Sequence, residues 1–585
     1  YFYFSGEKGK GARLVKEVRR KPLSFREGAL HAYLRGLVLL GEGDTSRGMR
    51  ELARCVSTYP GSQESERAWE KFRILTRMKD ISPEPETVLL VASALEGMGK
   101  FREAEELLKS ETSLFQGKER GEMLLLLADC VRRQGRYEEA VSLLTQEDPS
   151  IPAGIRGEML FYAGVYLWYR GRTGEAISLL ERVEREFAPK EVSFRAAYNA
   201  GRIHEEAGNF QSAYELYIRA SRSPARKIAE ESGFRAGLCL YLLGKFREAE
   251  VHFSRLSRKY APDNERFLFF RALSLEKIGR TSEAMGIYRS ILAGGKGGLY
   301  FFQSLRKVSG KYRWEVFSSL PFRRENPLTL GERFFREKKR EGALRRAIKR
   351  AFTFLDAGAW TFAAEEMERL FRSKGYGRGE LGVTLRFLFG DFPEALKIAS
   401  RTSIEPLPPV TRAHLLYPSI PIVSRVGEEM GDPFFLHAIM RQESLFDVHA
   451  VSSAGAIGLG QIMPATGRRI ARSMGMERFG PDLLFFPSVN ASFAARHLKG
   501  LLRKYGGNRI LAAAAYNGGE RSVSRWLRKF GGDPYLFPER IGFEETRRYV
   551  RRVMDHYLNY LRIYGDGWER VASLLSRSGK EGEKP

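Results

Sequence analysis

One short phrase recurs through the first half of this 585-residue chain: a glycine, usually followed two positions later by an aromatic residue, with an alanine five positions after the glycine. Consecutive glycines lie 36, 36, 37, 36 and 35 residues apart. A fixed period of this length indicates stacked supersecondary units, so it constrains the fold more than any other feature. The six copies are Gly99 with Ala104, Gly135 with Ala140, Gly171 with Ala176, Gly208 with Ala213, Gly244 with Ala249, and Gly279 with Ala284.

Each copy predicts a pair of helices joined by a tight turn. Apolar helical stretches precede and follow the glycine, as in residues 88–92 and 104–108. We expect the glycine to end the first helix in a left-handed conformation, the aromatic residue to pack the corner, and the alanine to let the helices approach closely. The pattern resembles the tetratricopeptide repeat from about residue 84 to about residue 292, with degenerate copies near Gly43, Gly358 and Gly390. This resemblance implies a curved scaffold, and the alternative is a peptide-binding groove.

The net charge of +26, from 97 basic and 71 acidic residues, indicates an anionic partner. The excess is spread along the chain, and we find no zinc finger, basic zipper or RNP signature. An acidic polymer is therefore favoured over nucleic acid, and no nucleic-acid partner is expected.

Several other features bound the class of protein. No apolar run approaches the roughly twenty residues that a membrane-spanning helix needs, so no span is expected. The chain begins at Tyr1 without a recognisable export signal, and we expect any such signal to be absent from this sequence. Cys55, Cys130 and Cys239 are predicted to be small buried residues rather than disulfide partners. The histidines lack zinc-site spacing, so neither a metal nor an organic cofactor is expected.

One carboxylate in the last third of the chain is a candidate general acid. Asp432 and Pro433 predict a helix start, and the helix should run to about Glu443. Glu443 follows Leu436, Ile439 and Met440 at helical spacing, so its carboxyl group falls on an apolar stripe. Desolvation there would raise its pKa, as a general acid near neutral pH requires. The alternative is that Glu443 merely ends a helix at a semi-exposed edge.

Four motif blocks surround and follow this glutamate, in residues 443–447, 452–464, 513–519 and 543–550. They read ESLFD, SSAGAIGLGQIMP, AAAYNGG and FEETRRYV. In order and spacing they resemble the catalytic domain of soluble lytic murein transglycosylases, whose fold is similar to goose-type lysozyme, over about residues 418 to 565. Gly455, Gly458 and Gly460 do not form a nucleotide-binding loop, because no strand precedes them and their spacing is reversed.

The resemblance implies a reaction with Glu443 as the single general acid/base. It would protonate the β-1,4 glycosidic oxygen between N-acetylmuramic acid and N-acetylglucosamine, then deprotonate the sugar's C6 hydroxyl, leaving a 1,6-anhydro end. The N-acetyl group would act as internal nucleophile, so no second carboxylate is needed. The alternatives are a muramidase that hydrolyses the same bond and a non-catalytic glycan-binding scaffold.

The same resemblance implies that seven residues bind substrate: Ser444, Gln461, Met463, Tyr516, Asn517, Glu545 and Tyr549. For Tyr516 the alternative is a core aromatic, for Asn517 a helix cap, for Gln461 and Met463 loop packing, and for Glu545 and Tyr549 a surface or packing role. Gly460 departs from the family, which commonly carries a larger residue there. We expect this loss of a side chain to widen the cleft or loosen the loop.

The sequence therefore predicts an all-α protein: a helical-repeat superhelix followed by a lysozyme-like catalytic domain. We expect a tetratricopeptide-like superhelix over residues 1–300, a helical linker region over 301–417, a lysozyme-like lytic transglycosylase domain over 418–567 and a polar tail over 568–585. The expected partners are peptidoglycan glycan strands, with recruitment of other cell-wall proteins through the repeats as a further option, and the expected compartment is the periplasm. Exo or endo cleavage, stem-peptide preference, ring closure of the superhelix and oligomeric state are left open.

Overall fold

The computed structural model describes residues 25–78, 81–261, 264–294, 298–309, 416–476 and 478–566, with isolated positions at 350, 353, 396 and 397. Most of the predicted linker region, the repeat copies near Gly358 and Gly390, and the predicted tail over 568–585 lie outside the described residues. The chain divides into two compact units, Tyr1–Leu256 and Ser257–Pro585.

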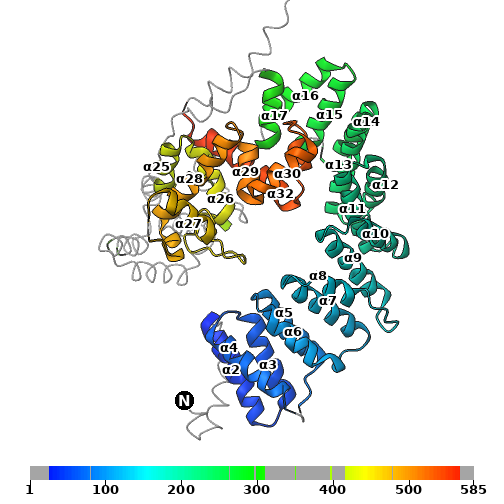
Figure 1. Ribbon diagram of the computed structural model, residues 1–585, viewed down its shortest axis with the longest axis vertical. Coiled ribbons are helices and arrows are strands. Elements are labelled where there is room, and N and C mark those ends of the chain that lie inside the picture. The colour runs from blue at the N-terminus through cyan, green and yellow to red at the C-terminus, as the bar shows by residue number, and fades with distance from the viewer. Residues whose placement is uncertain are drawn as a thin grey trace, which may run out of the picture. The chain divides into compact units, whose positions relative to one another are not determined.

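Unit 1 consists of helices that pack against their neighbours in sequence, drawn from blue to green in Figure 1. Alternate helices also touch, as α7 touches α9 and α9 touches α11, so the pairs stack as repeats do. The helices are α2 (Phe25–Gly41), α3 (Thr45–Thr58), α4 (Gln63–Thr76), α5 (Pro85–Gly97), α6 (Phe101–Ser110), η2 (Thr112–Leu114), α7 (Gly117–Arg133), α8 (Tyr137–Leu144), α9 (Ala153–Tyr169), α10 (Thr173–Glu186), α11 (Glu191–Ala207), α12 (Phe210–Ala220), α13 (Arg226–Leu242) and α14 (Phe246–Tyr260), whose last turn crosses into unit 2.

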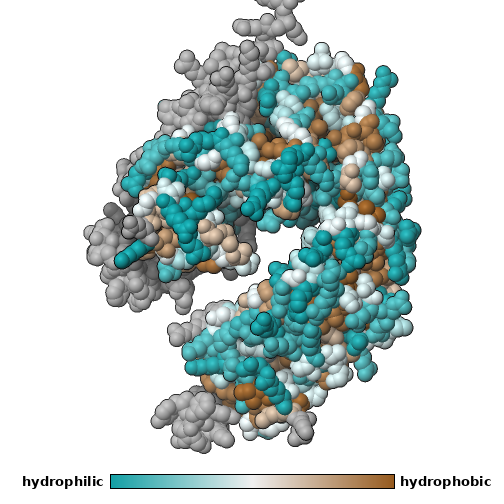
Figure 2. Space-filling view, viewed as in Figure 1, coloured by the Kyte–Doolittle hydropathy of each residue, from teal (hydrophilic) through white to brown (hydrophobic). Residues whose placement is uncertain are grey.

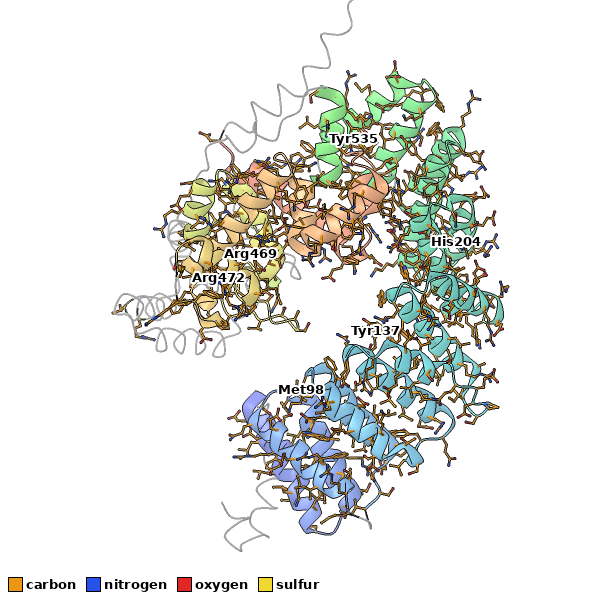
Figure 3. All side chains as sticks on the ribbon, viewed as in Figure 1. Met98, Tyr137, His204, Arg469, Arg472 and Tyr535 are labelled. Carbon is orange, nitrogen blue, oxygen red and sulfur yellow. The ribbon has the colours of Figure 1, made fainter. Side chains whose placement is uncertain are left out.

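The repeat turns have the predicted conformation. All six repeat glycines have positive φ, from 77° at Gly99 and Gly244 to 88° at Gly208, and all six alanines are fully buried. Tyr137 is one of the corner aromatics and lies under the Arg170 guanidinium, 5.7 Å from its ring centroid (Figure 3). Gly43 has the same conformation, with φ of 85°, so the degenerate copy at this position is also a helical hairpin. The helix-turn-helix prediction is confirmed.

The interior of unit 1 is mainly apolar, and hydrophilic residues cover most of the visible face of its helices (Figure 2). Cys55, Cys130 and Cys239 are buried and form no disulfide, as predicted, and burial raises the thiol pKa of Cys55 and Cys130 to about 12. Buried Glu205 accepts hydrogen bonds from the Tyr217 hydroxyl at 2.6 Å and from Arg235 at 3.1 Å.

Unit 2 combines the last repeat helices with the segment that carries the motif blocks. The long helix α32 is its centre, because α26, α29 and α17 all pack against it. The helices are α15 (Glu265–Lys277), α16 (Thr281–Gly294), α17 (Gly298–Ser309), α25 (Pro421–Met430), α26 (Pro433–Ser444), α27 (Pro464–Ser473), η3 (Pro481–Phe485), α28 (Pro487–Lys504), α29 (Arg509–Gly518), α30 (Glu520–Phe530), α31 (Phe537–Arg540) and α32 (Glu544–Tyr564).

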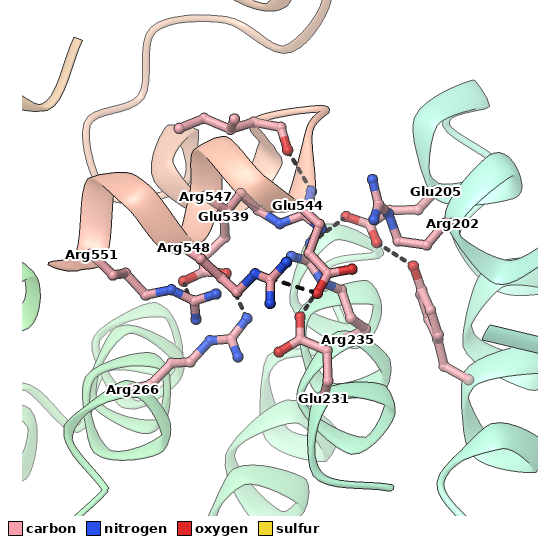
Figure 4. A network of polar contacts seen from close by, with 12 residues as sticks. Arg202, Glu205, Glu231, Arg235, Arg266, Glu539, Glu544, Arg547, Arg548 and Arg551 are labelled. Atoms are coloured by element: carbon pink, nitrogen blue, oxygen red, sulfur yellow. Dashed lines mark hydrogen bonds and ion pairs between the residues drawn. The ribbon is translucent and has the colours of Figure 1, made fainter. Parts of the chain in front are cut away.

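Polar contacts join the last repeat helices to the motif-bearing segment within this unit. Buried Glu539 pairs with Arg266 at 2.6 Å and faces Arg551 at 3.9 Å (Figure 4), and it also accepts a hydrogen bond from the Tyr300 hydroxyl. The Gly298 amide donates to Asp555 at 2.7 Å. The boundary expected at residue 300 therefore falls inside α17, whereas the compact units divide at Leu256, because α15 and α17 make these contacts with the segment that follows.

The described part of the chain is helical and has no multi-residue strand; its extended pairings are isolated bridges such as those from Ile457 to Val451 and to Ile462. The all-α prediction is confirmed. Among the described residues, no helix has the length and apolarity to span a membrane, and no group of three or more potential metal ligands comes together.

Candidate active site

Glu443 lies at the end of α26 on the apolar stripe that the sequence predicts. Asp432 caps the helix by accepting a hydrogen bond from the Phe435 amide at 3.0 Å, and Pro433 occupies the first turn. Leu436, Ile439 and Met440 are fully buried on the same helix. The pKa of Glu443 is raised to about 7, chiefly by burial; the hydrogen bond from Tyr549 lowers it and the nearby Glu545 charge adds to the rise.

Tyr549, on α32, directly contacts the candidate acid. Its hydroxyl donates a hydrogen bond of 2.6 Å to Glu443 Oε1, and its side chain is buried. Glu545, one turn earlier on α32, is exposed, whereas Glu544 turns away to pair with Arg548 at 3.7 Å. The structure thus brings Glu545 and Tyr549 to Glu443, as their four-residue spacing predicts.

Tyr516, on α29, lies near Glu443 and Tyr549. The three groups are close enough that ionisation of one affects the pKa of the others. Its hydroxyl donates a 2.7 Å hydrogen bond to the Gly460 carbonyl oxygen, and its buried position raises its pKa well above the usual value. The phenol is therefore held in place by the loop that carries Gln461, and its oxygen keeps its lone pairs for a further donor.

Residues 451–462 form a compact loop beside α26, and two predicted site residues hold it. The Ser444 hydroxyl donates to the Leu459 carbonyl oxygen at 2.8 Å. Gln461 has positive φ, and its amide nitrogen donates to the carbonyl oxygens of Ala450 at 3.1 Å and Gly458 at 3.0 Å. Both side chains thus stabilise the loop through these hydrogen bonds, while Met463, which precedes α27, is 41% exposed.

Asn517 does not cap α29. The helix continues through Gly518, and Gly519 ends it with φ of 82°. The Asn517 side-chain oxygen instead accepts a 2.7 Å hydrogen bond from the Thr546 hydroxyl, so it joins α29 to the first turn of α32. The alternative in which Asn517 caps the helix is therefore not what the structure has.

Asn490, on α28, is central to the site and was missed by the sequence analysis. It is fully buried, and its side chain accepts a hydrogen bond from the Gly460 amide at 2.8 Å. Its amide nitrogen donates to the carbonyl oxygens of Ile457 and Leu484, each at 2.8 Å. One side chain thus fixes the loop that holds Tyr516. The available signal was a lone asparagine on the apolar stripe that Ala494, Leu498 and Leu501 continue.

Gly460 is packed rather than loose. A Cβ atom at this position would lie 2.7 Å from the Ala494 Cβ, 3.0 Å from the Tyr516 hydroxyl and 3.3 Å from the Asn490 side-chain oxygen. The expected widening or loosening is therefore not what the structure has, because Tyr516 and Ala494 occupy the space that a side chain would need.

A buried ion pair between Asp432 and Arg509 joins the helices that carry the candidate site. Asp432 receives two hydrogen bonds from Arg509, at 3.0 and 2.6 Å, and one from the Tyr557 hydroxyl at 3.2 Å. This cluster joins the start of α26 to α29 and α32, the three helices that carry Glu443, Tyr516 and Tyr549. Because these contacts join the three helices, they fix the positions of the Glu443 carboxyl group and the two phenols relative to one another.

Comparison with known families identifies both parts of the chain. The tetratricopeptide repeat family matches residues 89–153, 163–226 and 234–298, which confirms the predicted repeats. The Transglycosylase SLT domain family matches residues 423–535, which contain Glu443, the loop and Tyr516. This chain therefore combines tetratricopeptide repeats with a Transglycosylase SLT domain.

Among proteins of the soluble lytic murein transglycosylase family, the enzyme of Salmonella typhimurium is 35% identical over 142 residues, 24% of this chain and 22% of the relative. A putative family member of Haemophilus influenzae is 41% identical over 128 residues, 22% of each chain. The match to these curated relatives thus spans about a fifth of their length.

Solved structures extend the likeness in fold to nearly the whole chain. The soluble lytic transglycosylase Slt70 of Escherichia coli has a TM-score of 0.58 at 17% identity, covering 95% of this chain and 85% of that one. An inactive mutant of lytic transglycosylase Slt from Pseudomonas aeruginosa has a TM-score of 0.54 at 20% identity, covering 98% and 87%.

Proposed function

We propose that this protein is a peptidoglycan lytic transglycosylase. It cleaves the β-1,4 bond between N-acetylmuramic acid and N-acetylglucosamine and leaves a 1,6-anhydro-N-acetylmuramic acid end. The match of residues 423–535 to the Transglycosylase SLT domain family supports the substrate class, and the chemistry of Glu443 supports the reaction. Since the related enzymes act on murein, the cell-wall polymer, the periplasm is the compartment that fits this proposal.

The observation that carries the proposal is the state of the Glu443 carboxyl group. With its pKa raised to about 7, the carboxyl group is close enough to neutral pH to donate a proton and to take one back within a cycle. An ordinary exposed glutamate would be almost fully ionised at that pH and would be a poor acid.

The reaction needs one residue that acts twice. Glu443 protonates the glycosidic oxygen as the bond to the muramyl C1 breaks, and the substrate's N-acetyl group stabilises the positive charge that develops there. The Glu443 carboxylate then removes the proton from the C6 hydroxyl, whose oxygen bonds to C1. The proton is returned to Glu443, so the cycle closes without water.

Two tyrosines support this cycle in the proposed mechanism. Tyr549, bonded to Glu443, orients the carboxyl group and favours its charged form in the second half of the reaction. Tyr516 presents a fixed phenol beside the acid for contact with the N-acetyl group. Ser444 and Gln461 act through the loop that they hold, and exposed Met463 and Glu545 contact the glycan directly.

Mass spectrometry of muropeptides released from purified peptidoglycan tests the proposal. The wild-type protein should release products with 1,6-anhydro ends, lighter by one water than hydrolysis products. Glu443→Gln keeps the size and the hydrogen bond but cannot transfer a proton, so its turnover should fall at least ~100-fold. Glu544→Gln, which changes a carboxylate that pairs with Arg548 and faces away from the acid, serves as the control and should keep most of the activity.

Reducing ends in place of anhydro ends would instead make the protein a muramidase, in which water is the acceptor. Binding to peptidoglycan without any released product would favour the glycan-binding scaffold. Full activity of Glu443→Gln would mean that another group is the acid.

A further inference from the structure

An arginine-rich helix follows directly after the loop of the candidate site. α27 buries Gly467, Ile470 and Ala471, and it exposes three arginines on its other side. These are Arg468, Arg469 and Arg472, and the latter two are labelled in Figure 3. Arg496, on α28, donates hydrogen bonds to the Ser473 side chain at 3.1 Å and to its carbonyl oxygen at 3.0 Å, which places a fourth guanidinium at the end of the helix. We call these four residues the α27 arginine cluster.

The charge of this cluster is only weakly balanced nearby, because Glu520, which lies near Arg469, pairs with Lys504 at 2.6 Å. No aspartate or glutamate occurs in the sequence between Asp447 and Glu477. Elsewhere arginines pair with a glutamate three residues ahead, as Arg172 does with Glu175 and Arg280 with Glu283. Within the described part of the chain, no member of the α27 arginine cluster makes such an ion pair. Unpaired like charges on one helix repel, so an anionic ligand would bind there favourably.

The cluster adjoins the candidate site. α27 begins immediately after Met463, and Arg469 lies close enough to His497 and Glu520 to affect their protonation. The His497 ring lies 5.4 Å from the Tyr516 ring. At 1.5 Å per residue, the nine residues from Met463 to Arg472 cover about 13 Å, leading away from the loop.

Resting on the proposed function, this arrangement has a specific ligand. The muramyl sugar next to the cleaved bond carries the stem peptide, whose carboxylates are the negative charges of peptidoglycan. An extended peptide covers about 3.3–3.6 Å per residue, so roughly four residues span the same ~13 Å. We propose that the α27 arginine cluster binds the stem-peptide carboxylates and gives the enzyme a preference for peptide-bearing glycan.

The test compares two substrates made from one peptidoglycan preparation: glycan strands with their peptides, and the same strands after an amidase has removed them. Arg468, Arg469 and Arg472 are replaced together by Gln in the full chain. Exposed ion pairs are individually weak, so the three changes together should raise the KM for peptide-bearing strands about tenfold, with kcat unchanged. The KM for peptide-free strands should stay within twofold.

Two matched variants complete the design. The combination of Arg102→Gln, Lys227→Gln and Arg247→Gln removes the same charge from exposed positions of unit 1 and should leave both KM values unchanged. Lysine at all three α27 positions keeps the charge and should restore KM for peptide-bearing strands to within threefold of wild type. Raising the salt concentration should weaken wild-type binding of peptide-bearing strands more than that of the Gln variant.

The outcomes separate the two proposals. Equal loss on both substrates, or no loss on either, would overturn the role of the α27 arginine cluster while leaving the transglycosylase proposal intact. Absence of anhydro products from both substrates with the wild-type protein would overturn the proposed function itself.

Discussion

The Tyr549 hydroxyl donates a 2.6 Å hydrogen bond to Glu443 Oε1, although 106 residues separate the two in the chain. Burial disfavours the charge on Glu443, and this bond favours it. The balance of the two effects sets the pH at which the carboxyl group gains and loses its proton. The pH dependence of the reaction therefore depends on this contact.

The acid must be protonated when the substrate binds, so kcat/KM should fall about tenfold per pH unit above pH ~7. Tyr549→Phe removes the bond that stabilises the carboxylate, so the pKa of Glu443 should rise. The pH above which kcat/KM falls (the falling limb of the pH profile) should therefore rise by up to ~1 unit, and kcat should be lower. Tyr505→Phe, which removes a hydroxyl at the end of α28, is the control and should leave the limb in place. An unmoved limb with only a higher KM would mean that Tyr549 acts on the substrate rather than on Glu443.

Glu443 should also make the fold less stable at alkaline pH. Its pKa rises from 4.5 to about 7 on folding, so the native state binds the proton more tightly than the unfolded state. Stability is therefore lost as the pH rises from about 4.5 to about 7. Glu443→Gln removes this loss, so its free energy of unfolding should exceed that of the wild type by roughly 1–3 kcal/mol at pH 8 and match it at pH 4. Urea unfolding at both pH values measures the difference, and an equal difference at both would contradict the assignment.

Gly460 should tolerate no side chain. Gly460→Ala places a Cβ atom 2.7 Å from the Ala494 Cβ and 3.0 Å from the Tyr516 hydroxyl, so the loop or Tyr516 must shift. We expect a loss of about 1–3 kcal/mol in stability and a lower kcat. Gly500→Ala is the matched control, because a Cβ atom at Gly500, also within unit 2, has no neighbour within 4 Å. It should stabilise α28 by about 0.5–1 kcal/mol. Similar effects of the two changes would mean that the packing around Gly460 is unimportant.

Glu539 should anchor the last repeat helices to the motif-bearing segment of unit 2. Glu539→Gln leaves Arg266 and Arg551 facing each other without the buried charge that balances them. The expected cost is about 2–4 kcal/mol in the free energy of unfolding, measured by urea denaturation. Glu544→Gln removes an exposed carboxylate whose pair with Arg548 is 3.7 Å long, and it should cost less than about 0.5 kcal/mol.

The features that follow from local spacing were predictable from the sequence. The repeat glycines and alanines, the Asp432 cap and the apolar stripe below Glu443 all depend on residues a few positions apart. The hydrogen bonds of Asn490 were not predictable in this way. Their partners are backbone atoms of Ile457, Gly460 and Leu484, and every residue type has these backbone atoms, so the sequence does not reveal which of them Asn490 contacts. For the same reason, the hydrogen bonds from Gln461 to the Ala450 and Gly458 carbonyl oxygens could not be predicted. The division of the chain at Leu256 depends on buried contacts of α15 and α17 with residues more than 200 positions away.

The segments on both sides of residues 310–415 contact the same helix, α32. α17 ends at Ser309 after packing on α32, where Phe302 lies 5.5 Å from Tyr557. The chain is described again at 416, and the Tyr417 carbonyl oxygen accepts a 2.7 Å hydrogen bond from Tyr564 of the same helix. A protease that cuts the backbone between these points would leave α17 in one fragment and α32 in the other, and the contacts between these two helices would hold the fragments together. Such nicked protein should run as two bands in denaturing gels and as a single particle in native ones.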